Sequence, residues 1–554
     1  MLINLLNKVY IDPIYNWNID KRKSTACFFK GWFESEGFVY SCDKGASKIA
    51  ELFSEEMKSE EVERAINSLK GNFGFILITT TQILASVDKV RSYPIFYSIK
   101  DNVCSVSNSA RLLQREKKLY QKDENSFLEF KMAGYVSGPK TLFKGLFQIQ
   151  AGECFLWNEE QNVKLTRYFR YCTKKISSGN EKQLIEELYE ITLNVFRQMV
   201  IRLNGKPVCI PLSAGYDSRL ILAMLKKLKY DNIWCFFYGA PGNANWERKY
   251  SLDTAKKLKV PWTHVSYNRG YVRDCFKSCL WKEYGKYADN LCSVPSYIYL
   301  FYMKWLDENN LLKEDTVIIN GQSGDFTSGN HLFELITRPP ISRESIYNAI
   351  IDKHFSLWLN LKTPDNIKRI KLSIDKVTTN VFGYNGLSSQ SAASMLDYWE
   401  WNERQTKYVI NGQRVYDFYR IKWELPFWED DYLHFWKTIP WNMKLNQKFF
   451  IKFMTEVNLF GLFKDFQPKI SIPLSKRSIS LPFYFLTRFF AQWKRDQLVQ
   501  KYLRYFVYPN KFYSIITYSE YLKTSAYHRS PVSYFCLKHL QEQEIEDGKP
   551  IFLE

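Results

Sequence analysis

Residues 208–228 read VCIPLSAGYDSRLILAMLKKL, and this stretch decides the fold. Its first part is an apolar run typical of a buried strand, and its last part places leucine, isoleucine and methionine at helical spacing. Between the two lies a short loop of small and hydroxyl residues, 213–218. The stretch therefore predicts a strand, a tight loop and a helix in direct succession.

A loop of this kind can hold a phosphate or a pyrophosphate. Small residues let backbone N–H groups turn inward, the helix adds the positive end of its dipole, and two serine hydroxyls add donors. Asp217 would repel phosphate, so we expect it to hold a Mg2+ ion that bridges the phosphates. For these six residues alone, an ordinary strand-to-helix turn with a serine N-cap is the alternative interpretation.

The size and charge of the chain bound its class. At 554 residues the chain exceeds what one hydrophobic core usually serves, so we expect two or more domains. Hydrophobic residues make up 45% of it, enough for a sizeable core. The formal net charge of +19 fits nucleic acid, an anionic membrane surface or an anionic substrate as partner and selects none of them.

The eleven cysteines are scattered singly, and the closest pair, Cys275 and Cys279, has helical rather than metal-binding spacing. We therefore expect reduced thiols in a cytoplasm. The first residues lack the pattern of a signal peptide, and no run approaches the roughly 20 apolar residues that span a bilayer. The sequence predicts a cytoplasmic protein that is soluble or peripheral at the inner membrane face.

Residues 1–172 alternate short apolar runs with turn signals, which is typical of a sheet-rich region. The predicted strands lie at 27–33, 73–78, 83–87 and 95–99, and the one predicted helix lies at 59–69. The polar stretch 174–180 then predicts a linker.

From residue 181 to residue 554 the pattern changes to strands that alternate with helices. Helices are predicted at 181–199 and 246–258, and further strands at 233–238, 262–267 and 316–319. This alternation predicts a parallel sheet with helices on both faces, where ligands bind at the carboxyl ends of the strands. We expect the loops after Leu212, Tyr238 and Ile319 to converge on one site.

The third of these loops carries a second carboxylate. Residues 320–330 read NGQSGDFTSGN, a glycine-rich loop that presents Asp325. A solvated turn is the alternative for this loop alone. Two carboxylates that meet at phosphates are what Mg2+ requires, because it prefers oxygen ligands, so Asp217 and Asp325 together predict a magnesium site.

Several blocks, in order, resemble the asparagine synthetase family over nearly the whole chain. Residues 213–218 resemble the family's Ser-Gly-Gly-x-Asp-Ser loop, with Ala214 at the first glycine, and 238–255 resemble the stretch that accommodates adenosine. Residues 320–329 resemble Ser-Gly-Glu-Gly-Ala-Asp-Glu-x-Phe-Gly. Arg404 and 423–429 resemble the family's Arg and its Glu-x-Arg-x-Pro-Phe-Leu-Asp block, and 467–469 resemble Arg-Pro-Lys. Near the N-terminus, 71–75, Asp88, Arg91 and 93–97 resemble the glutaminase half of that family.

The resemblance implies an α+β N-terminal nucleophile hydrolase-like sandwich over residues 1–172. It implies an α/β parallel-sheet ATP pyrophosphatase domain over residues 181–554, helical and basic toward the C-terminus.

The family joins a carboxylate to an amine through an acyl-adenylate, so the resemblance also implies ATP and Mg2+ as cofactors. The implied ATP contacts are Leu212, Ser213, Ala214, Gly215, Tyr216, Asp217, Ser218, Tyr238, Gly239 and Gly321, and the implied metal ligands are Asp217 and Asp325. The implied catalytic positions are Lys469, Arg404 and Gln322, with Lys464 and Lys476 as competitors for the role of Lys469.

Two departures from the family concern the supply of nitrogen. The glutaminase needs a cysteine with a free α-amine at residue 2, where this chain has Leu2, so we expect a buried, structural Cys27 and no glutamine hydrolysis. Gln322 stands where the family has a glutamate, and an amide cannot take a proton from the incoming amine. Either another group serves as base, with Glu247 and Glu424 as candidates, or the nucleophile differs.

The leading hypothesis is an ATP-dependent, AMP-forming amide ligase that transfers a carboxylate, with a sugar uronate of a surface polysaccharide as the preferred guess, to ammonia or a small amine. The alternatives are a tRNA-modifying enzyme and a catalytically degenerate nucleotide-binding homologue. No RNA-binding module is visible, so nucleic acid is not favoured. The basic, aromatic stretch 437–523 predicts either contact with anionic lipid or a buried helix with a solvated basic face.

Overall fold

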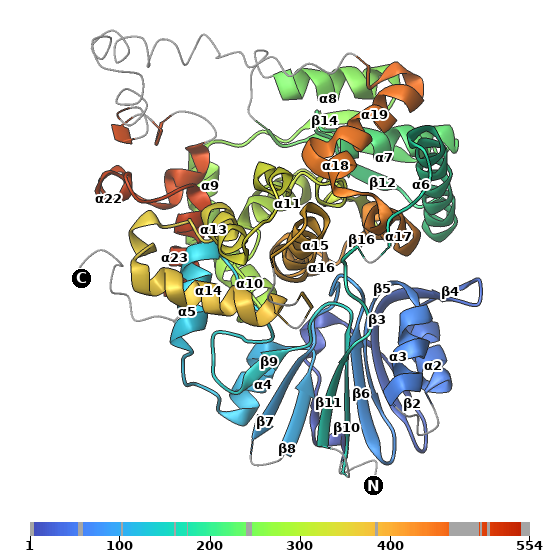
Figure 1. The fold of residues 1–554 in the computed structure, drawn as a ribbon, viewed down its shortest axis with the longest axis vertical. Helices are drawn as coiled ribbons and strands as arrows, with labels where there is room; N and C mark the ends of the chain where they lie inside the picture. Colours follow the sequence, from blue (N-terminus) through green and yellow to red (C-terminus); the bar gives the residue numbers. More distant parts are fainter. Residues whose placement is uncertain are drawn as a thin grey trace.

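Figure 1 shows the computed structural model, which has two sheet layers at one end and a helix-rich body around a third sheet at the other. It describes residues 5–53, 59–100, 103–159, 162–173, 175–239, 246–379, 381–382, 386–464, 498, 501–502, 504–506 and 510–543.

Two sheets form the N-terminal sandwich, by which we mean residues 9–167. The larger sheet has the order β11-β10-β6-β5-β3-β2, with β4 added beside β3, and the smaller has the order β1-β8-β7-β9. The strands of the larger sheet are β2 (Asn18–Lys21), β3 (Ala26–Ser35), β4 (Phe38–Ser41), β5 (Lys70–Ile78), β6 (Gln82–Val87), β10 (Glu153–Asn158) and β11 (Asn162–Arg167). Those of the smaller are β1 (Val9–Tyr10), β7 (Phe96–Lys100), β8 (Val103–Ser107) and β9 (Leu146–Gln148).

Alternation along β5 explains why the two sheets stack. Ile76 and Ile78 belong to a core cluster shared with Tyr97 and Val106 of the smaller sheet. Phe75 and Leu77, on the opposite face of the same strand, belong to the cluster that includes the flanking helices. Because side chains alternate between faces along a strand, β5 can serve both cores. The expected sandwich is therefore present.

The sandwich has more helices than the single one expected at 59–69. The helices are α2 (Cys42–Leu52), α3 (Ser59–Ser68), α4 (Ala110–Lys117) and α5 (Glu124–Ala133). Helix α2 buries small residues, among them Gly45, whose position leaves no room for a side chain because a Cβ would lie 2.4 Å from the Phe29 ring. Three of its four buried residues are glycine or alanine, so the helix lacks the large apolar residues that mark a helix in a sequence.

The third sheet, in the helical body, is parallel, as its sequence pattern predicted. Its order is β14-β13-β12-β15-β16, and every neighbouring pair is parallel. Its strands are β12 (Val208–Pro211), β13 (Ile233–Phe237), β14 (Trp262–His264), β15 (Val317–Ile319) and β16 (Lys422–Glu424). The opening stretch thus forms the central strand β12 and the following helix α7 (Tyr216–Lys227).

Helices surround this sheet (Figure 1). They include α6 (Glu181–Leu203), α8 (Trp246–Lys257), α9 (Arg269–Lys277), α10 (Cys279–Ala288), α11 (Tyr297–Glu308), α12 (Gly324–Thr327), α13 (Arg343–His354), α14 (Pro364–Thr378), α15 (Ser389–Trp399), α16 (Arg414–Phe418), α17 (Asp430–Thr438), α18 (Trp441–Lys444), α19 (Lys448–Val457), α22 (Tyr518–Thr524) and α23 (Pro531–Glu542). Between α15 and α16 the chain forms a π-helix, η4 (Glu400–Val409).

Buried polar contacts join the sandwich to the helical body. Lys89 forms a buried ion pair with Asp430, and the backbone carbonyl of Lys89 accepts a 2.8 Å hydrogen bond from the indole of Trp401. Arg414 donates to the carbonyl of Ser92 over 2.6 Å. One hydrophobic cluster includes residues of both parts.

Within the described ranges, no helix has the length and apolar character needed to cross a membrane. The basic, aromatic stretch 437–523 lies partly outside the described residues, so its two interpretations stay predictions.

Candidate active site at the carboxyl edge of the parallel sheet

The loop 213–218 is held in shape by its own two serines. The Ser213 amide donates to Oγ of Ser218 over 3.1 Å, the two hydroxyl oxygens are 3.0 Å apart, and the Gly215 amide donates to Oγ of Ser213 over 3.1 Å. Gly215 caps helix α7 without a side-chain hydrogen bond to the first turn. The loop is therefore preformed around the N-terminus of α7, the end of a helix that attracts anions.

Ala214 replaces a family glycine without backbone strain. Its backbone is not in the left-handed region that favours glycine, and its side chain is buried. An alanine methyl group fits where the loop turns toward the core, so the shape of the loop survives the replacement.

Asp217 and the acidic loop, by which we mean residues 320–325, touch each other. A Cβ added to Gly324 would lie 2.5 Å from Oδ1 of Asp217, and one added to Gly321 would lie 3.1 Å from the Asp217 Cβ. The two glycines therefore let the loops after β12 and β15 approach closely. Asp325, the residue after Gly324, lies close enough to Asp217 to contribute to raising its pKa.

The chemistry of this carboxylate pair fits a divalent cation. Burial, and then repulsion from Asp325, raise the pKa of Asp217 well above its ordinary value. Among the described residues, no group of three or more His, Cys, Asp and Glu side chains is arranged to hold a metal. A Mg2+ ion here would take two protein carboxylates and complete its shell with phosphate oxygens and water, the arrangement it prefers.

Tyr238 and Gly239, which directly follow β13, lie at the same edge of the sheet. The ring of Tyr238 packs on Tyr302 and Tyr299 of α11, with centroid distances of 4.7 and 6.5 Å. The next residue must be small, because a Cβ on Gly239 would lie 2.1 Å from the Phe237 ring. The described residues that follow β12, β13 and β15 thus lie at the carboxyl edge of the sheet, as the strand pattern predicted.

Gln322 is fixed by hydrogen bonds at both ends of its amide. Its Nε2 donates to the Tyr299 hydroxyl over 2.6 Å, and its Oε1 accepts from Nε2 of Gln413. Its backbone amide donates to Asn320 over 3.1 Å. The side chain is therefore oriented, but it offers no group that can take a proton.

A cavity of about 480 Å³ opens beside the acidic loop. Its walls include Gln322 and Asp325 from the loop, Tyr299 from α11, Lys353 from α13, and Glu400, Arg404 and Tyr408 from the π-helix. The volume lies within the range of small-molecule sites. The cavity therefore adjoins the acidic loop and is large enough to hold a second reactant.

Charges on the wall of this cavity are coupled. Arg404 lies 3.4 Å from Glu400, one turn earlier on the π-helix, and Glu400 lies 2.9 Å from His354. Burial alone would raise the pKa of Glu400, but His354 and Arg404 hold it below its ordinary value. Burial also lowers the pKa of Lys353. An anionic reactant in this cavity would contact the cations Lys353 and Arg404 at this wall.

Other expected residues lie elsewhere. Arg219, on the helix that follows the loop, is buried and donates to the carbonyls of Gly215 and Leu462 over 3.2 and 2.6 Å. Glu424, a candidate base, forms an ion pair with Arg202 at 2.9 Å and does not line the cavity of Gln322. Glu247 belongs to α8 and does not line it either.

Lys469 and Lys476 lie outside the described residues, so their predicted roles are untested, and Lys464 lies at the exposed end of the described segment.

The sandwich does not present Cys27 as a nucleophile. Cys27 is fully buried in β3, opposite Leu77, and burial raises the pKa of its thiol. Asp88 is buried as well, accepts hydrogen bonds from the amides of Phe73 and Val90 over 2.9 and 2.7 Å, and has a pKa raised by burial to about 6. These side chains shape the sandwich interior.

Sequence reasoning missed the cavity wall formed by Tyr299, Lys353, Glu400 and Tyr408. These residues belong to helices between the predicted motifs, and no local pattern marks them. The one available signal is the four-residue spacing between Glu400 and Arg404, which on a helix brings opposite charges together.

Fold and site together define an α/β protein whose preformed anion loop and acidic loop meet at the carboxyl edge of a parallel sheet. The asparagine synthase family model matches residues 195–456, which supports the expected assignment to that family.

Solved structures that resemble the chain include an allosteric regulatory enzyme of purine biosynthesis, at 11% identity and a TM-score of 0.20 over 42% of this chain and 50% of that one. They also include the glutamine phosphoribosylpyrophosphate amidotransferase from B. subtilis, at 11% identity and a TM-score of 0.19 over 55% of this chain and 63% of that one. This chain thus covers less than two thirds of each, and at these TM-scores the likeness carries no argument about function. No curated protein matched the chain.

Proposed function

We propose that the protein is an ATP-dependent, AMP-forming amide ligase in which loop 213–218 receives the pyrophosphate of ATP. The observation that carries this proposal is the contact of Asp217 with the acidic loop at the end of the central strands. Asp217 and Asp325 would hold Mg2+, which neutralises charge on the phosphates when bound.

The reaction proceeds in two balanced steps. An oxygen of the substrate carboxylate attacks the α-phosphorus of ATP, and the bond to pyrophosphate breaks. The nitrogen of ammonia or a small amine then attacks the acyl carbon, AMP leaves with the bonding electron pair, and the nitrogen loses a proton. Positioning and charge neutralisation at phosphorus are the contributions of the protein.

The cavity beside the acidic loop is proposed to hold the carboxylate substrate. Lys353 and Arg404 supply positive charge at its wall, and polar groups such as Gln322 and Tyr408 line it. Such a wall suits a hydroxylated acid, and a sugar uronate is the first substrate to test. The proposed division of the chain into residues 1–172 and 181–554 assigns all of this chemistry to the second part.

Glutamine is not the proposed source of nitrogen. A buried Cys27 with a raised pKa is a poor nucleophile, because the thiolate is the reactive form. The protein should therefore release no glutamate from glutamine, and Cys27→Ser should not change amide formation. Measurable glutamate release that Cys27→Ser abolishes would contradict this part of the proposal.

The adenylation step is tested by pyrophosphate release from Mg-ATP with a panel of carboxylates, uronates included. We expect release that depends on the carboxylate and falls about 100-fold or more in Asp217→Asn, since a lost metal ligand costs several kcal/mol of stabilisation. Asp231→Asn, at an exposed aspartate paired with Lys226, is the matched control and should behave as the wild type. Equal rates in Asp217→Asn and the wild type, or no release with any acid, would refute the proposal.

A further inference from the structure

A second cavity lies between the sandwich and the parallel sheet, separate from the candidate active site. Its volume is about 520 Å³, and we call it the interface cavity. Gly31 and Trp32 of β3 line one side, and Trp423 and Glu424 of β16 line another. Sites for small molecules often form where two parts of a chain meet, and this volume is typical of them.

The interface cavity has aromatic walls that are held in place. Tyr93 and Trp423 are more than nine-tenths buried, with their rings 5.7 Å apart. The guanidinium of Arg202 stacks on the Trp32 ring at 3.8 Å and forms ion pairs with Glu424 and Glu429. The flat walls therefore exist before any ligand arrives.

Cations remain after the internal ion pairs are assigned. Glu424 is paired with Arg202, and Asp417 is paired with Arg414 at 2.7 Å. The lining still includes Lys30, Lys206, Arg420 and Lys422. For Lys206 the described partner is Asp315, an exposed carboxylate 3.1 Å away. The cavity thus has a surplus of positive charge.

Two of these lysines, Lys206 and Lys422, lie on neighbouring segments of the lining. Val317 joins the two segments: it is the register partner of Lys422, and its amide donates to the carbonyl of Pro207, the residue after Lys206, over 2.8 Å. Burial, then Lys206, lower the pKa of Lys422. Two like charges on neighbouring segments repel, and an anion between them would replace that repulsion with two charge-assisted hydrogen bonds.

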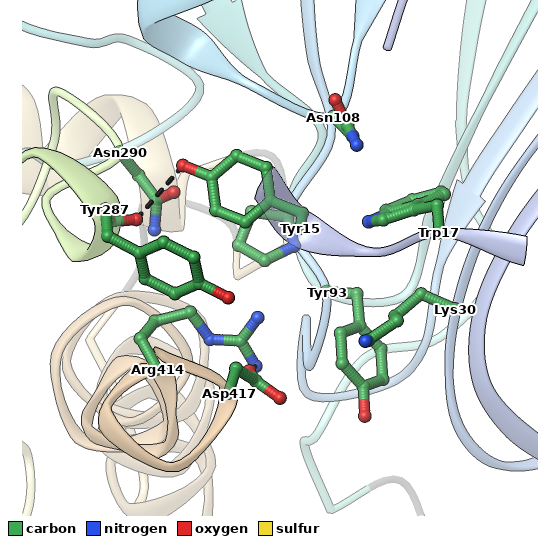
Figure 2. Close-up of a pocket in the computed structure, with 10 residues that line it drawn as sticks. Tyr15, Trp17, Lys30, Tyr93, Asn108, Tyr287, Asn290, Arg414 and Asp417 are labelled. Atoms are coloured by element: carbon green, nitrogen blue, oxygen red, sulfur yellow. Dashed lines mark hydrogen bonds and ion pairs between the residues drawn. The ribbon is translucent and has the colours of Figure 1, made fainter. Parts of the chain in front are cut away.

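Lys30 approaches from the neighbouring small cavity. Figure 2 shows Lys30 and Tyr93 facing Arg414 and Asp417 across it, and these two cavities share Lys30, Tyr93 and Asp417. The Lys30 amine donates to the carbonyl of Asn16 over 3.3 Å. A third ammonium group is therefore within the same lining.

We propose that the interface cavity binds a small aromatic anion, with its ring against Trp32, Tyr93 and Trp423 and its acidic group at Lys206 and Lys422. Phosphate and carboxylate share the chemistry that the paired ammonium groups recognise. The site does not depend on the ligase reaction.

Alkylation of a cysteine in the lining can report whether a ligand occupies the interface cavity. Cys42 lines it and is exposed, and Cys279 is the other exposed thiol of the chain. Both are the first residue of a helix, α2 and α10, after a serine that makes no side-chain cap. Cys279 is therefore a matched internal control for alkylation.

The test measures the alkylation rates of Cys42 and Cys279 by iodoacetamide with peptide mass spectrometry, with and without phenyl phosphate, benzoate or benzyl alcohol. We expect either anion to slow alkylation of Cys42 alone, and the neutral alcohol to leave it unchanged. Protection by phenyl phosphate assigns the site to a phosphate, and protection by benzoate assigns it to a carboxylate. No protection by either anion, or equal protection by the alcohol, overturns the proposal.

Charge-removal variants separate the lysine pair from general ionic effects. In Lys206→Met/Lys422→Met the anion concentration needed for protection should rise about tenfold or more, since a hydrogen bond to a charged group is worth at least that factor. Lys304→Ala, which removes a lysine paired with Glu308 outside the cavity, should leave it unchanged. If the double variant fails to fold, Lys422→Met alone serves, and unchanged protection in a folded variant refutes the assignment.

Discussion

At the scale of single residues, the buried position of Asp217 lowers the stability of the ligand-free protein when its carboxyl group is ionised. Its folded pKa lies well above the ordinary value of 3.8 because it is buried beside Asp325. The folded state thus binds its proton more tightly than the unfolded state does. The stability associated with this proton is complete below the ordinary pKa and is lost as pH rises through the folded pKa.

Asp217→Asn should therefore raise the melting temperature of the metal-free protein at about pH 8 by a few degrees, with a smaller gain toward about pH 5. Mg-ATP should stabilise the wild type and not the variant. Differential scanning fluorimetry in EDTA and in Mg-ATP measures both effects. An equal response of both proteins to Mg-ATP would remove Asp217 from the metal site.

Gln322 offers a gain-of-function test at the same scale. In Gln322→Glu the Tyr299 hydroxyl can donate to the new carboxylate and Gln413 can keep its hydrogen bond, so the geometry accepts the change. A base at this position should raise amide formation with ammonia by about tenfold or more. Product is quantified by mass spectrometry, with Gln322→Leu as the low-rate control. A folded Gln322→Glu enzyme that is no faster would show that another group takes the proton.

At the scale of elements, the π-helix η4 connects the cavity wall to the sandwich. Toward the cavity it presents Arg404 and Tyr408. Toward the sandwich, Glu403 accepts from the Gly138 amide over 3.0 Å, and Lys407 donates to the Gly138 carbonyl over 2.6 Å. π-Helical turns within helices are frequent at functional sites.

The pair of Glu403 and Lys407 is fully buried, so removing one partner should be costly. Lys407→Met leaves the carboxylate of Glu403 without its cation, and we expect a loss of about 3–5 kcal/mol. The double variant Glu403→Gln/Lys407→Met should be less affected than Lys407→Met, because no unpaired charge remains. Urea denaturation compares the midpoints. If Lys407→Met unfolds at the same urea concentration as the wild type, the pair does not hold this interface.

Sequence patterns predicted the elements in which apolar residues recur with a clear helical or strand period. The central strand, its loop, helix α7 and the parallel order of the sheet followed from the stretch 208–228 and its repeats. Helix α2 was missed because it packs through glycine and alanine, and β14 is shorter than predicted, ending at His264. The loop residues of the site were predictable because each follows a strand. Lys353 and Glu400 were not, because only tertiary packing brings their helices to the cavity.

At the scale of the whole molecule, the sandwich and the helical body share buried polar contacts. Trp401 donates to the Lys89 carbonyl, and Lys407 reaches the carbonyls of Val136 and Gly138. Separating the two parts would leave these donors and the Asp430 carboxylate without partners. Orphaned buried groups carry a large desolvation penalty.

Residues 175–554 expressed alone should therefore aggregate, and coexpression with residues 1–174 should recover soluble material. Size-exclusion chromatography with circular dichroism measures both. A monodisperse, folded fragment would show that the sandwich contributes little to the stability of the rest.

Strand β16 has a consequence for inhibitor discovery. Its Trp423 borders the interface cavity, while the carbonyl of the next residue, Glu424, accepts a 3.1 Å hydrogen bond from Asn320 at the start of the acidic loop. A compound lodged against Trp423 would push on the strand that anchors this loop. Such a compound would lower turnover without competing with nucleotide, so screens run at saturating ATP are the ones suited to find it.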